Sequence, residues 1–479
     1  MKHLKVALSD SVQSQIKSIA GRTCVGVFET DFTDVGAVVI GDGELDLISN
    51  NQISSFGIPI IVLRVDASRD ISLDGNRITS IIELLSMSID ACTSEIEKVV
   101  ASYEDSILPP FFRALSDYVG DQNSQFDCPG HQGGQFFYKH PTGRAFYNFF
   151  GENIFRADLC NADVKLGDLL IHEGYAYDAQ AHAAKVYNAD KTYFVLNGTS
   201  SANKVVLNAL LTPGDIILYD RNNHKSICHG GLVMSGATPI YLETARNPFG
   251  SIGGILDHCF DESYIRQLVA EKSPEKANAK RPIRLAVIQL GTYDGTIYNA
   301  RQVVDKIGHL CDYIFFDSAW VGYEQFIPMM KDCSPLLLEL GPNDPGILVT
   351  QSVHKQQAGF SQTSQIHKKD SHIKGQERYV DHKRFNNSFM MHASTSPFYP
   401  LFASLDVNAK IHEGELGQTL WRECVEVAID ARKAVLKQCK YLRPLVPPIV
   451  HGKPWEEGNT HEMACDVKYF AFEPEAKWH

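Results

Sequence analysis

Long apolar runs, paired cysteines and basic clusters are all missing from this sequence. No stretch of the 479 residues approaches the roughly 18 uninterrupted apolar residues that a membrane-spanning helix needs. The N-terminal segment MKHLKVALSDS turns polar before an apolar signal core could form. We therefore expect a cytoplasmic protein with no membrane partner.

Cysteine usage and charge narrow the class of protein further. The 11 cysteines are scattered, with no C-x-x-C pair, and their number is odd. This distribution disfavours a disulfide framework and a zinc site, so we expect free thiols and no metal ion. The net charge of -12 comes without any stripe of Arg and Lys, which argues against a nucleic-acid partner.

The apolar patterning predicts several α/β layers rather than one core, because 479 residues suffice for two to four domains. Buried parallel strands are predicted near the N-terminus at Lys5–Leu8, Val25–Phe28, Ala37–Ile40 and Ile60–Val65, with helices at Asp10–Ala20 and Ser88–Tyr103. A second, mainly parallel sheet is predicted from Thr192–Leu196, Asp215–Leu218, Leu285–Gln289, Tyr313–Phe316 and Ile347–Thr350.

We expect four segments from this pattern. They are an α/β N-terminal domain (1–107), a linker region (108–155), a larger α/β domain (156–415) and the beginning of an α+β C-terminal domain (416–479). In the last segment Gly414–Lys440 reads as one long helix and Val467–Phe472 as a strand. Because the sequence stops soon afterwards, we expect that domain to be incomplete.

The segment NGTSSANK (197–204) follows a predicted strand and opens a predicted helix. Gly198 permits a tight turn, and Thr199, Ser200 and Ser201 place hydroxyl and N–H groups at the helix N-terminus. Such an end binds anions, phosphate included. Taken alone, the same residues are typical of an ordinary N-cap.

Two further side chains stand at predicted strand ends. His224, in DRNNHKS, has the right shape to lie flat on an aromatic ring, although a surface or capping histidine is the simpler reading of it alone. Asp317 ends the apolar strand of FFDSAW, where a carboxylate is unfavourable unless it is paired. A protonated pyridine nitrogen would be a suitable partner, and a helix N-cap is the alternative.

Lys355 follows the last of these strands, in VTQSVHKQQAGFSQTSQIH (349–367), between Ser352 and a run of small residues. A desolvated lysine acquires a lower pKa and becomes nucleophilic. Most lysines are simply exposed, so the position gains meaning only from its companions.

The four features occur in the order anion cup, His, Asp and Lys, which resembles the aspartate-aminotransferase-like class of pyridoxal 5′-phosphate (PLP) enzymes, fold type I. Longer motifs resemble the bacterial inducible ornithine/lysine/arginine decarboxylase family over essentially the whole chain. They are SVHKQQAGFSQTSQIH, DSAWVGYEQF, LGTYDGTIYN, NADVKLGDLLIHEG and STSPFYP. The lysine and arginine branches tend to carry Leu-Leu after the lysine, so Gln356-Gln357 resembles the ornithine branch.

The resemblance implies a role for each matching residue. Lys355 forms the Schiff base with PLP, Asp317 holds the pyridine nitrogen, and His224 and Ala319 cover the two ring faces. Thr199, Ser200, Ser201, Ser352 and His354 bind the phosphate, Thr292 reaches the ring hydroxyl, and Trp320 lines the pocket. Thr395 and Ser396 reach the phosphate of a neighbouring subunit, which implies a homodimer with a shared active site. The N-terminal domain is implied to be a flavodoxin-like wing that assembles dimers into rings.

The implied reaction is decarboxylation of L-ornithine to putrescine and CO2, with Lys355 or His354 as the acid that protonates the α-carbon. Transamination uses the same four features and stays open, as does lysine or arginine decarboxylation. A third alternative is a PLP-binding fragment without turnover, because in the family the next domain supplies acidic residues around the substrate's distal amine.

Overall fold

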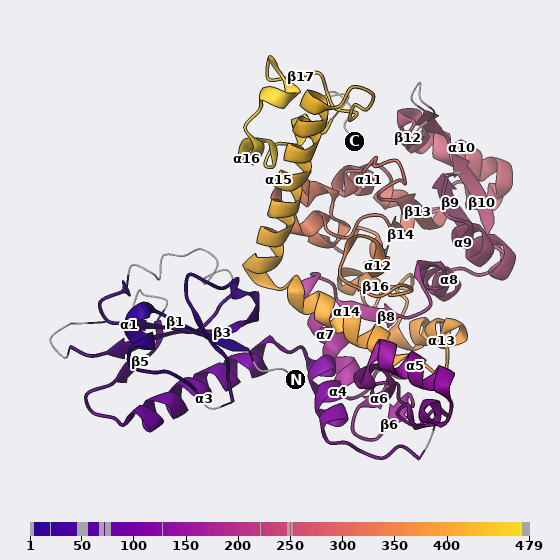
Figure 1. Ribbon diagram of the computed structural model, residues 1–479. Helices are drawn as coiled ribbons and strands as arrows, with labels where there is room; N and C mark the ends of the chain where they lie inside the picture. Colours follow the sequence, from indigo (N-terminus) through magenta and orange to yellow (C-terminus); the bar gives the residue numbers. More distant parts are fainter. Residues whose placement is uncertain are drawn as a thin grey trace. The chain divides into compact units, whose positions relative to one another are not determined.

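The computed structural model describes residues 4–19, 21–45, 56–66, 71, 78–126, 128–220, 222–246, 250 and 252–471. The chain divides into two compact units, Met1–Pro109 and Pro110–His479, each with its own apolar core (Figure 1).

The first unit is built on a five-stranded sheet in the order β2-β1-β3-β4-β5, with every neighbouring pair parallel. This strand order is that of flavodoxin-like folds, and the expected fold of this unit is confirmed. The strands are β1 (Lys5–Leu8), β2 (Cys24–Gly26), β3 (Val35–Gly41), β4 (Ile60–Arg64) and β5 (Ile78–Glu83), and the described helices are α1 (Asp10–Gln13) and α3 (Ile89–Ile107).

The sequence-based prediction of a helix over Asp10–Ala20 is wrong in its length. The α-helix α1 ends at Gln13, although Ile16 and Ile19 continue to bury their side chains against the sheet. Ala20 lies outside the described residues. The apolar spacing therefore identified the buried residues correctly, but α1 carries only the first of them and an irregular segment carries the others.

One ion cluster joins the first strand region of this unit to α3. The Arg22 side chain is 1% exposed, and its guanidinium donates to both oxygens of Glu104 at 2.7 and 2.8 Å and to Glu97 at 2.9 Å. It also donates to the Leu4 carbonyl oxygen at 3.1 Å. These contacts raise the pKa of Arg22, so the side chain is permanently charged.

The second unit contains a seven-stranded sheet in the order β10-β9-β13-β14-β15-β16-β8. Its strands are β8 (Lys191–Val195), β9 (Ile216–Asp220), β10 (Thr238–Leu242), β13 (Ile283–Gln289), β14 (Cys311–Ser318), β15 (Gly346–Gln351) and β16 (Ser364–Lys369). Only the pairs that involve β16 are antiparallel, so the other six strands run in one direction. The expected mostly parallel α/β sheet is confirmed, although β10 and β16 were not predicted.

Side chains of this sheet alternate between two apolar layers. On β14, Ile314 and Phe316 face one layer, whereas Tyr313 and Phe315 face the other. Helices α4 (Pro110–Gly120), α7 (Tyr175–Val186), α11 (Ala300–Ile307) and α14 (Tyr399–Ile411) pack on the first layer, and α8 (Thr199–Leu210) and α13 (His382–His392) pack on the second. Both faces of the sheet are thus covered, as its continuous apolar strands require.

The remaining elements are short or peripheral. The helices are α5 (Pro141–Phe150), α6 (Glu152–Arg156), α9 (Lys225–Cys228), α10 (Glu262–Lys272), α12 (Val353–Gln356), α15 (Gly414–Gln438) and α16 (Thr460–Met463). The two-stranded pairs are β6 (Ala162–Asp163) with β7 (Gly167–Asp168), β11 (Thr244–Arg246) with β12 (Ile252–Ile255), and β17 (Ile449–Val450) with β18 (Lys453–Pro454). In the part of the chain that is described, no helix is both long and apolar enough to cross a membrane.

The predicted strand at Val467–Phe472 is also wrong. Val467–Tyr469 forms a 3-10 turn, because the Asp466 carboxylate accepts a hydrogen bond from the Lys468 N–H at 3.0 Å and caps it. The Trp455 indole donates to the Tyr469 carbonyl oxygen at 2.8 Å and holds this turn against the small core beside α15. Phe472 lies outside the described residues.

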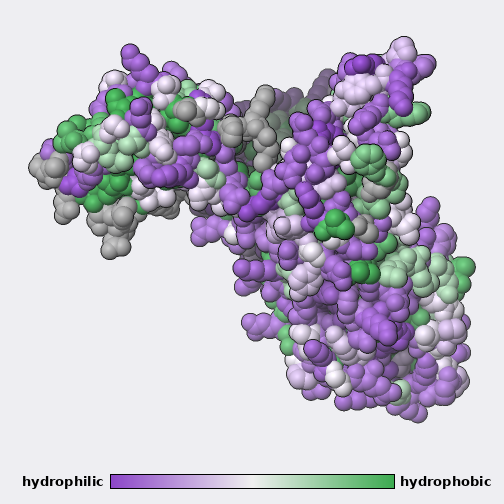
Figure 2. Space-filling model, turned by 90° about the horizontal axis from the view of Figure 1, so that it is seen from below, coloured by the Kyte–Doolittle hydropathy of each residue, from purple (hydrophilic) through white to green (hydrophobic). Residues whose placement is uncertain are grey.

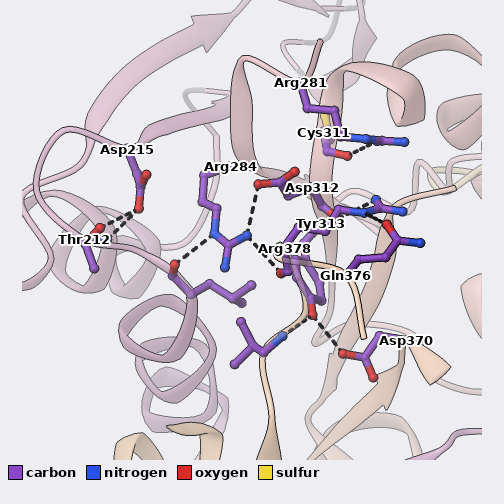
Figure 3. A network of polar contacts seen from close by, with 12 residues as sticks. Thr212, Asp215, Arg281, Arg284, Cys311, Asp312, Tyr313, Asp370, Gln376 and Arg378 are labelled. Carbon is purple, nitrogen blue, oxygen red and sulfur yellow. Dashed lines mark hydrogen bonds and ion pairs between the residues drawn. The ribbon is translucent and has the colours of Figure 1, made fainter. Parts of the chain in front are cut away.

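The N-terminal edge of the seven-stranded sheet is closed by a polar network (Figure 3). Arg284, at the start of β13, donates to Asp312 at 3.0 Å and to the carbonyl oxygens of Arg378 and Leu210. Beside it, the Tyr313 hydroxyl donates to Asp370 at 2.9 Å and accepts from a backbone N–H. Buried groups at this edge are therefore paired within the protein.

We predict that Arg22→Met lowers the unfolding free energy of the first unit by about 2 kcal/mol, because Glu97 and Glu104 lose the guanidinium group that pairs with both of them. Hydrogen exchange of β1 and α3 peptides in the full chain measures this change. Lys98→Met is the matched control: Lys98 pairs with Glu95 at the surface, with 68% of its side chain exposed, and should change stability by less than about 0.5 kcal/mol. Equal effects of the two variants would contradict the prediction.

Candidate active site at the C-terminal edge of the sheet

The C-terminal ends of five parallel strands meet at one edge of the seven-stranded sheet. Each of them leads into a segment that carries predicted site residues, which follow β8, β9, β13, β14 and β15. Ligands of open α/β sheets bind at this kind of edge. The segments lie up to about 150 residues apart in sequence, so only the parallel topology brings them together.

The segment after β8 makes a turn and opens a helix, as its sequence indicates. Gly198 has a positive φ of 77° and caps α8, whose first residue is Thr199. The buried Thr199 hydroxyl is hydrogen-bonded to the hydroxyls of Ser352 at 2.6 Å and Ser364 at 2.8 Å. The first N–H groups of a helix have no intrahelical acceptor, so this hydroxyl cluster surrounds a site suited to an anion.

Two predicted members of the cup differ from Thr199 in their surroundings. Ser200 is exposed and Ser201 is half-buried in the first turn of α8. Ser364, which the sequence analysis did not single out, opens β16 and donates to the Gln351 carbonyl oxygen at 2.8 Å. Only the antiparallel pairing of β16 between β15 and β8 brings Ser364 to this edge.

Asp317 places a carboxylate in the core at the end of β14, where its residue is 2% exposed. One oxygen accepts from the Asn203 amide at 2.9 Å, and the other accepts from the Ala319 N–H at 3.1 Å. Burial raises the pKa of Asp317, while these two hydrogen bonds and the nearby Lys355 ammonium oppose the rise. A cationic N–H donor bound here would favour the ionised form.

Asn203 is a site residue that the sequence analysis missed. Its amide nitrogen also donates to the Ser226 hydroxyl at 3.0 Å, and its oxygen accepts from the Thr350 hydroxyl at 2.8 Å. Ser226 is in turn hydrogen-bonded to the His224 ring at 2.8 Å. Through Asn203, the predicted His224 and Asp317 belong to one continuous hydrogen-bond chain.

Lys355 lies on α12, directly after β15, with its side chain exposed at the mouth of the site. Its ammonium nitrogen is 3.8 Å from the centroid of the Trp320 ring, a cation–π distance. Desolvation by its surroundings lowers the pKa of Lys355, although the Asp317 charge opposes that change. Desolvation lowers the pKa of the neighbouring His224 as well.

The neighbours of Lys355 fix the remaining geometry. The His354 ring donates through Nδ1 to the Thr363 carbonyl oxygen at 2.8 Å, which fixes the orientation of the ring. Ala319 and Trp320 follow β14 and are half-buried. No group of three or more His, Cys, Asp or Glu side chains among the described residues could hold a metal ion.

Thr292, Thr395 and Ser396 are predicted site residues that no described hydrogen bond joins to this cluster. The Thr292 hydroxyl is buried and accepts from the Thr296 N–H at 3.0 Å. Thr395 and Ser396 lie in an exposed turn between α13 and α14. Ser396 lines a mainly apolar cavity of about 190 Å³ that also reaches Asn197, the first residue of the 197–204 segment.

The loop after β14 buries a second carboxylate. Glu324 is 1% exposed and accepts from the Gly322 N–H at 2.7 Å. Burial raises the pKa of Glu324 to about 7. This carboxyl group therefore changes its ionisation in the physiological pH range while it supports the loop that carries Trp320.

Comparison with known proteins relates this chain to amino-acid decarboxylases. Residues 109–479 match the family described as Orn/Lys/Arg decarboxylase, major domain. The chain is 62% identical, over its whole length, to an ornithine decarboxylase of Haemophilus influenzae and 61% identical to an inducible ornithine decarboxylase of Escherichia coli. It spans only 66% and 65% of those relatives, or just under two thirds.

A solved structure agrees in fold. Lysine decarboxylase A from Pseudomonas aeruginosa matches 96% of this chain and 65% of its own, with a TM-score of 0.83 and 30% identity.

We predict that Glu324→Gln removes part of the pH dependence of stability. The folded pKa of about 7 exceeds the ordinary 4.5, so the folded state holds the proton more tightly. Unfolding free energy should therefore fall as the pH rises from about 5 to 8, by about 3 kcal/mol. The amide keeps the Gly322 contact and avoids this loss. Urea unfolding at pH 5 and pH 8 measures the difference, and Glu423→Gln, at an exposed position, is the control. Parallel pH profiles of wild type and Glu324→Gln would contradict the assignment.

Proposed function

This chain belongs to the Orn/Lys/Arg decarboxylase family, and on that premise we propose that it binds PLP and decarboxylates L-ornithine to putrescine and CO2. The observation that carries the choice of substrate is the contrast in identity. Relatives named ornithine decarboxylase are 59 to 62% identical over 99 to 100% of the chain, against 35 to 38% over 74 to 89% of the chain for relatives named lysine or arginine decarboxylase.

The residues at the sheet edge fit PLP in chemistry and in order. When bound, PLP supplies an aldehyde that condenses with amines and a pyridine ring that accepts the electrons left by departing CO2. Asp317 is our candidate partner for the ring nitrogen, since its carboxylate is buried and held in a fixed orientation by Asn203 and the Ala319 N–H. A preorganised carboxylate keeps that nitrogen protonated without having to reorient.

Lys355 is the proposed amine that holds the cofactor. Its lowered pKa increases the fraction of neutral, nucleophilic amine at neutral pH. Trp320 confines the ammonium group on one side and thereby limits the directions that the side chain can take. Lys355 is also our candidate for the acid that would return a proton to the substrate α-carbon, and His354 is the alternative acid.

The other predicted residues complete the proposed site. His224 and Ala319 would cover the two faces of the ring, and Thr292 would reach its hydroxyl. The hydroxyls of Thr199, Ser200, Ser201 and Ser352, together with His354, would bind the phosphate at the N-terminus of α8. The charge of the α8 dipole and the hydroxyl cluster around Thr199 both support this assignment.

We further propose a cytoplasmic homodimer in which Thr395 and Ser396 complete the partner's phosphate site. Both residues lie in an exposed turn, as this role requires. Hydrophobic patches interrupt the largely hydrophilic surface in Figure 2. Residues 126–150 expose large aromatic side chains that a second copy could cover, namely Phe126, Phe136, Phe146, Phe149 and Phe150. Residues 1–107 would act as an assembly domain, and 156–415 as the PLP-binding domain.

The cofactor assignment predicts that PLP added to the 479-residue chain gives a visible Schiff-base absorption band. Borohydride should then reduce the linkage and leave the pyridoxyl group on Lys355, as identified by peptide mass spectrometry. Lys355→Ala should lose the band altogether, because Lys355 is the lysine whose charge acts on the buried Asp317 carboxylate. Lys374→Ala, at an exposed site outside the sheet edge, should keep it. A pyridoxyl group on any other lysine would overturn the assignment.

The reaction is tested by the products formed from L-ornithine. We expect CO2 and putrescine, and at least tenfold slower turnover of L-lysine and L-arginine, since a misfitted distal amine leaves polar groups unpaired. A keto acid with pyridoxamine phosphate would replace this function with transamination. Faster release of CO2 from lysine or arginine would move the substrate to another branch. An intact Schiff-base band without either product would favour a PLP-binding chain that does not turn over.

A further inference from the structure

A buried hydrogen-bond network lies directly behind the turn that carries Lys355. Gln357 is the residue after α12, and its side-chain oxygen accepts from the Tyr187 hydroxyl at 2.6 Å and from the Asn408 amide at 3.0 Å. Tyr187, at the end of α7, and Asn408, on α14, are both fully buried. The turn is therefore attached from behind to two helices of the core.

Asn408 holds the backbone of the same turn. Its side-chain oxygen accepts from the Ala358 N–H at 3.0 Å, and its amide donates to the Tyr187 hydroxyl at 2.9 Å. Gln357 and the peptide that follows it are thus fixed to one side chain of α14. A change in the angle of α12 would have to break several of these hydrogen bonds together.

The other end of the Gln357 amide reaches the loop that carries Trp320. Its Nε2 donates to the Gly322 carbonyl oxygen at 2.8 Å. Gly322 has a φ of 116°, and a Cβ at this position would lie 2.4 Å from the same nitrogen. Only glycine permits both the backbone conformation and the close approach. Trp320, two residues earlier, is the residue whose ring lies 3.8 Å from the Lys355 ammonium.

We propose that Gln357 is a positioning residue: its side-chain amide ties the lysine turn to the Trp320 loop and so sets where the Lys355 amine points. Lys355 lies two residues before Gln357. Its contact partner Trp320 lies two residues before Gly322, whose carbonyl oxygen accepts from the Gln357 amide. These hydrogen bonds lie within the chain and need no cofactor, whereas their relevance to catalysis rests on the proposed PLP function.

A purely structural role makes a different prediction. If the amide only filled space, leucine would replace it with similar volume, and the Lys355 amine would keep its environment. With the tie, Gln357→Leu leaves the Gly322 carbonyl oxygen without this donor and the Tyr187 hydroxyl and the Asn408 amide without this acceptor. The two segments then separate, the ammonium becomes more fully hydrated, and its pKa rises.

The decisive comparison is Gln357→Leu against Gln356→Leu. Gln356 is the adjacent, exposed residue of the same type, and no described hydrogen bond involves its side chain. In the chain without cofactor, the pH dependence of acetic anhydride labelling at Lys355 is followed by peptide mass spectrometry. We expect the labelling midpoint of Gln357→Leu to move up by about half a unit or more toward the ordinary 10.5, and that of Gln356→Leu to stay with the wild type.

The same variants are then loaded with PLP. Loss of three hydrogen bonds made by the Gln357 amide should speed the disappearance of the Schiff-base band on dialysis by about tenfold in Gln357→Leu only. Tyr187→Phe keeps the packing of the ring and removes one donor, so it should shift the labelling midpoint in the same direction by less. It also decides the question should Gln357→Leu fail to fold, as judged by circular dichroism.

Identical labelling midpoints in folded wild type, Gln357→Leu and Tyr187→Phe would overturn the positioning role. A wild-type chain that never forms the Schiff-base band would contradict the proposed function instead. The labelling comparison needs no cofactor, so it decides the role of Gln357 in either case.

Discussion

Burial of the Asp317 carboxylate is the constraint on which the candidate site depends. A carboxylate that is almost fully removed from water is unfavourable unless hydrogen bonds or positive charge compensate it. Here the Asn203 amide and the Ala319 N–H provide two hydrogen bonds, and Lys355 provides nearby positive charge. Asn203 can do this only because Thr350 and Ser226 bind its remaining polar atoms. One buried charge thus explains a polar set drawn from four strand ends.

The two edges of the seven-stranded sheet treat polar groups in opposite ways. At the N-terminal edge, Arg284, Asp312 and Tyr313 bind one another and nearby carbonyl oxygens, which closes that edge (Figure 3). At the C-terminal edge, Lys355 stays exposed and the hydroxyls of the cup gather at a helix N-terminus. Because the polar groups of the N-terminal edge are already paired, only the C-terminal edge, among the described residues, offers polar groups that a ligand could bind.

The sequence carried enough information for the strands that are apolar and uninterrupted, because their burial on both faces needs such runs. It did not identify β16, since SQIHKK is polar and becomes a strand only by inserting between β15 and β8. Asn203 was missed for a related reason: an asparagine within a helix shows no periodic signal, and its value comes from Asp317, 114 positions later. The predicted strand at Val467–Phe472 failed because the apolar residues of Val467–Tyr469 form a turn that the Trp455 indole holds in place.

Gln356 and Gln357 show, in two adjacent residues, what the sequence alone could not predict. They have identical chemistry, and no rule of local sequence separates them. Yet the first faces solvent, whereas the second joins α7, α14 and the Trp320 loop through a single amide. The difference arises because the chain leaves α12 in an extended conformation at Gln357, which turns that side chain inward. The lysine that we propose to hold the cofactor lies on such a short helix and needs external fixation, since four residues of helix hold little orientation of their own.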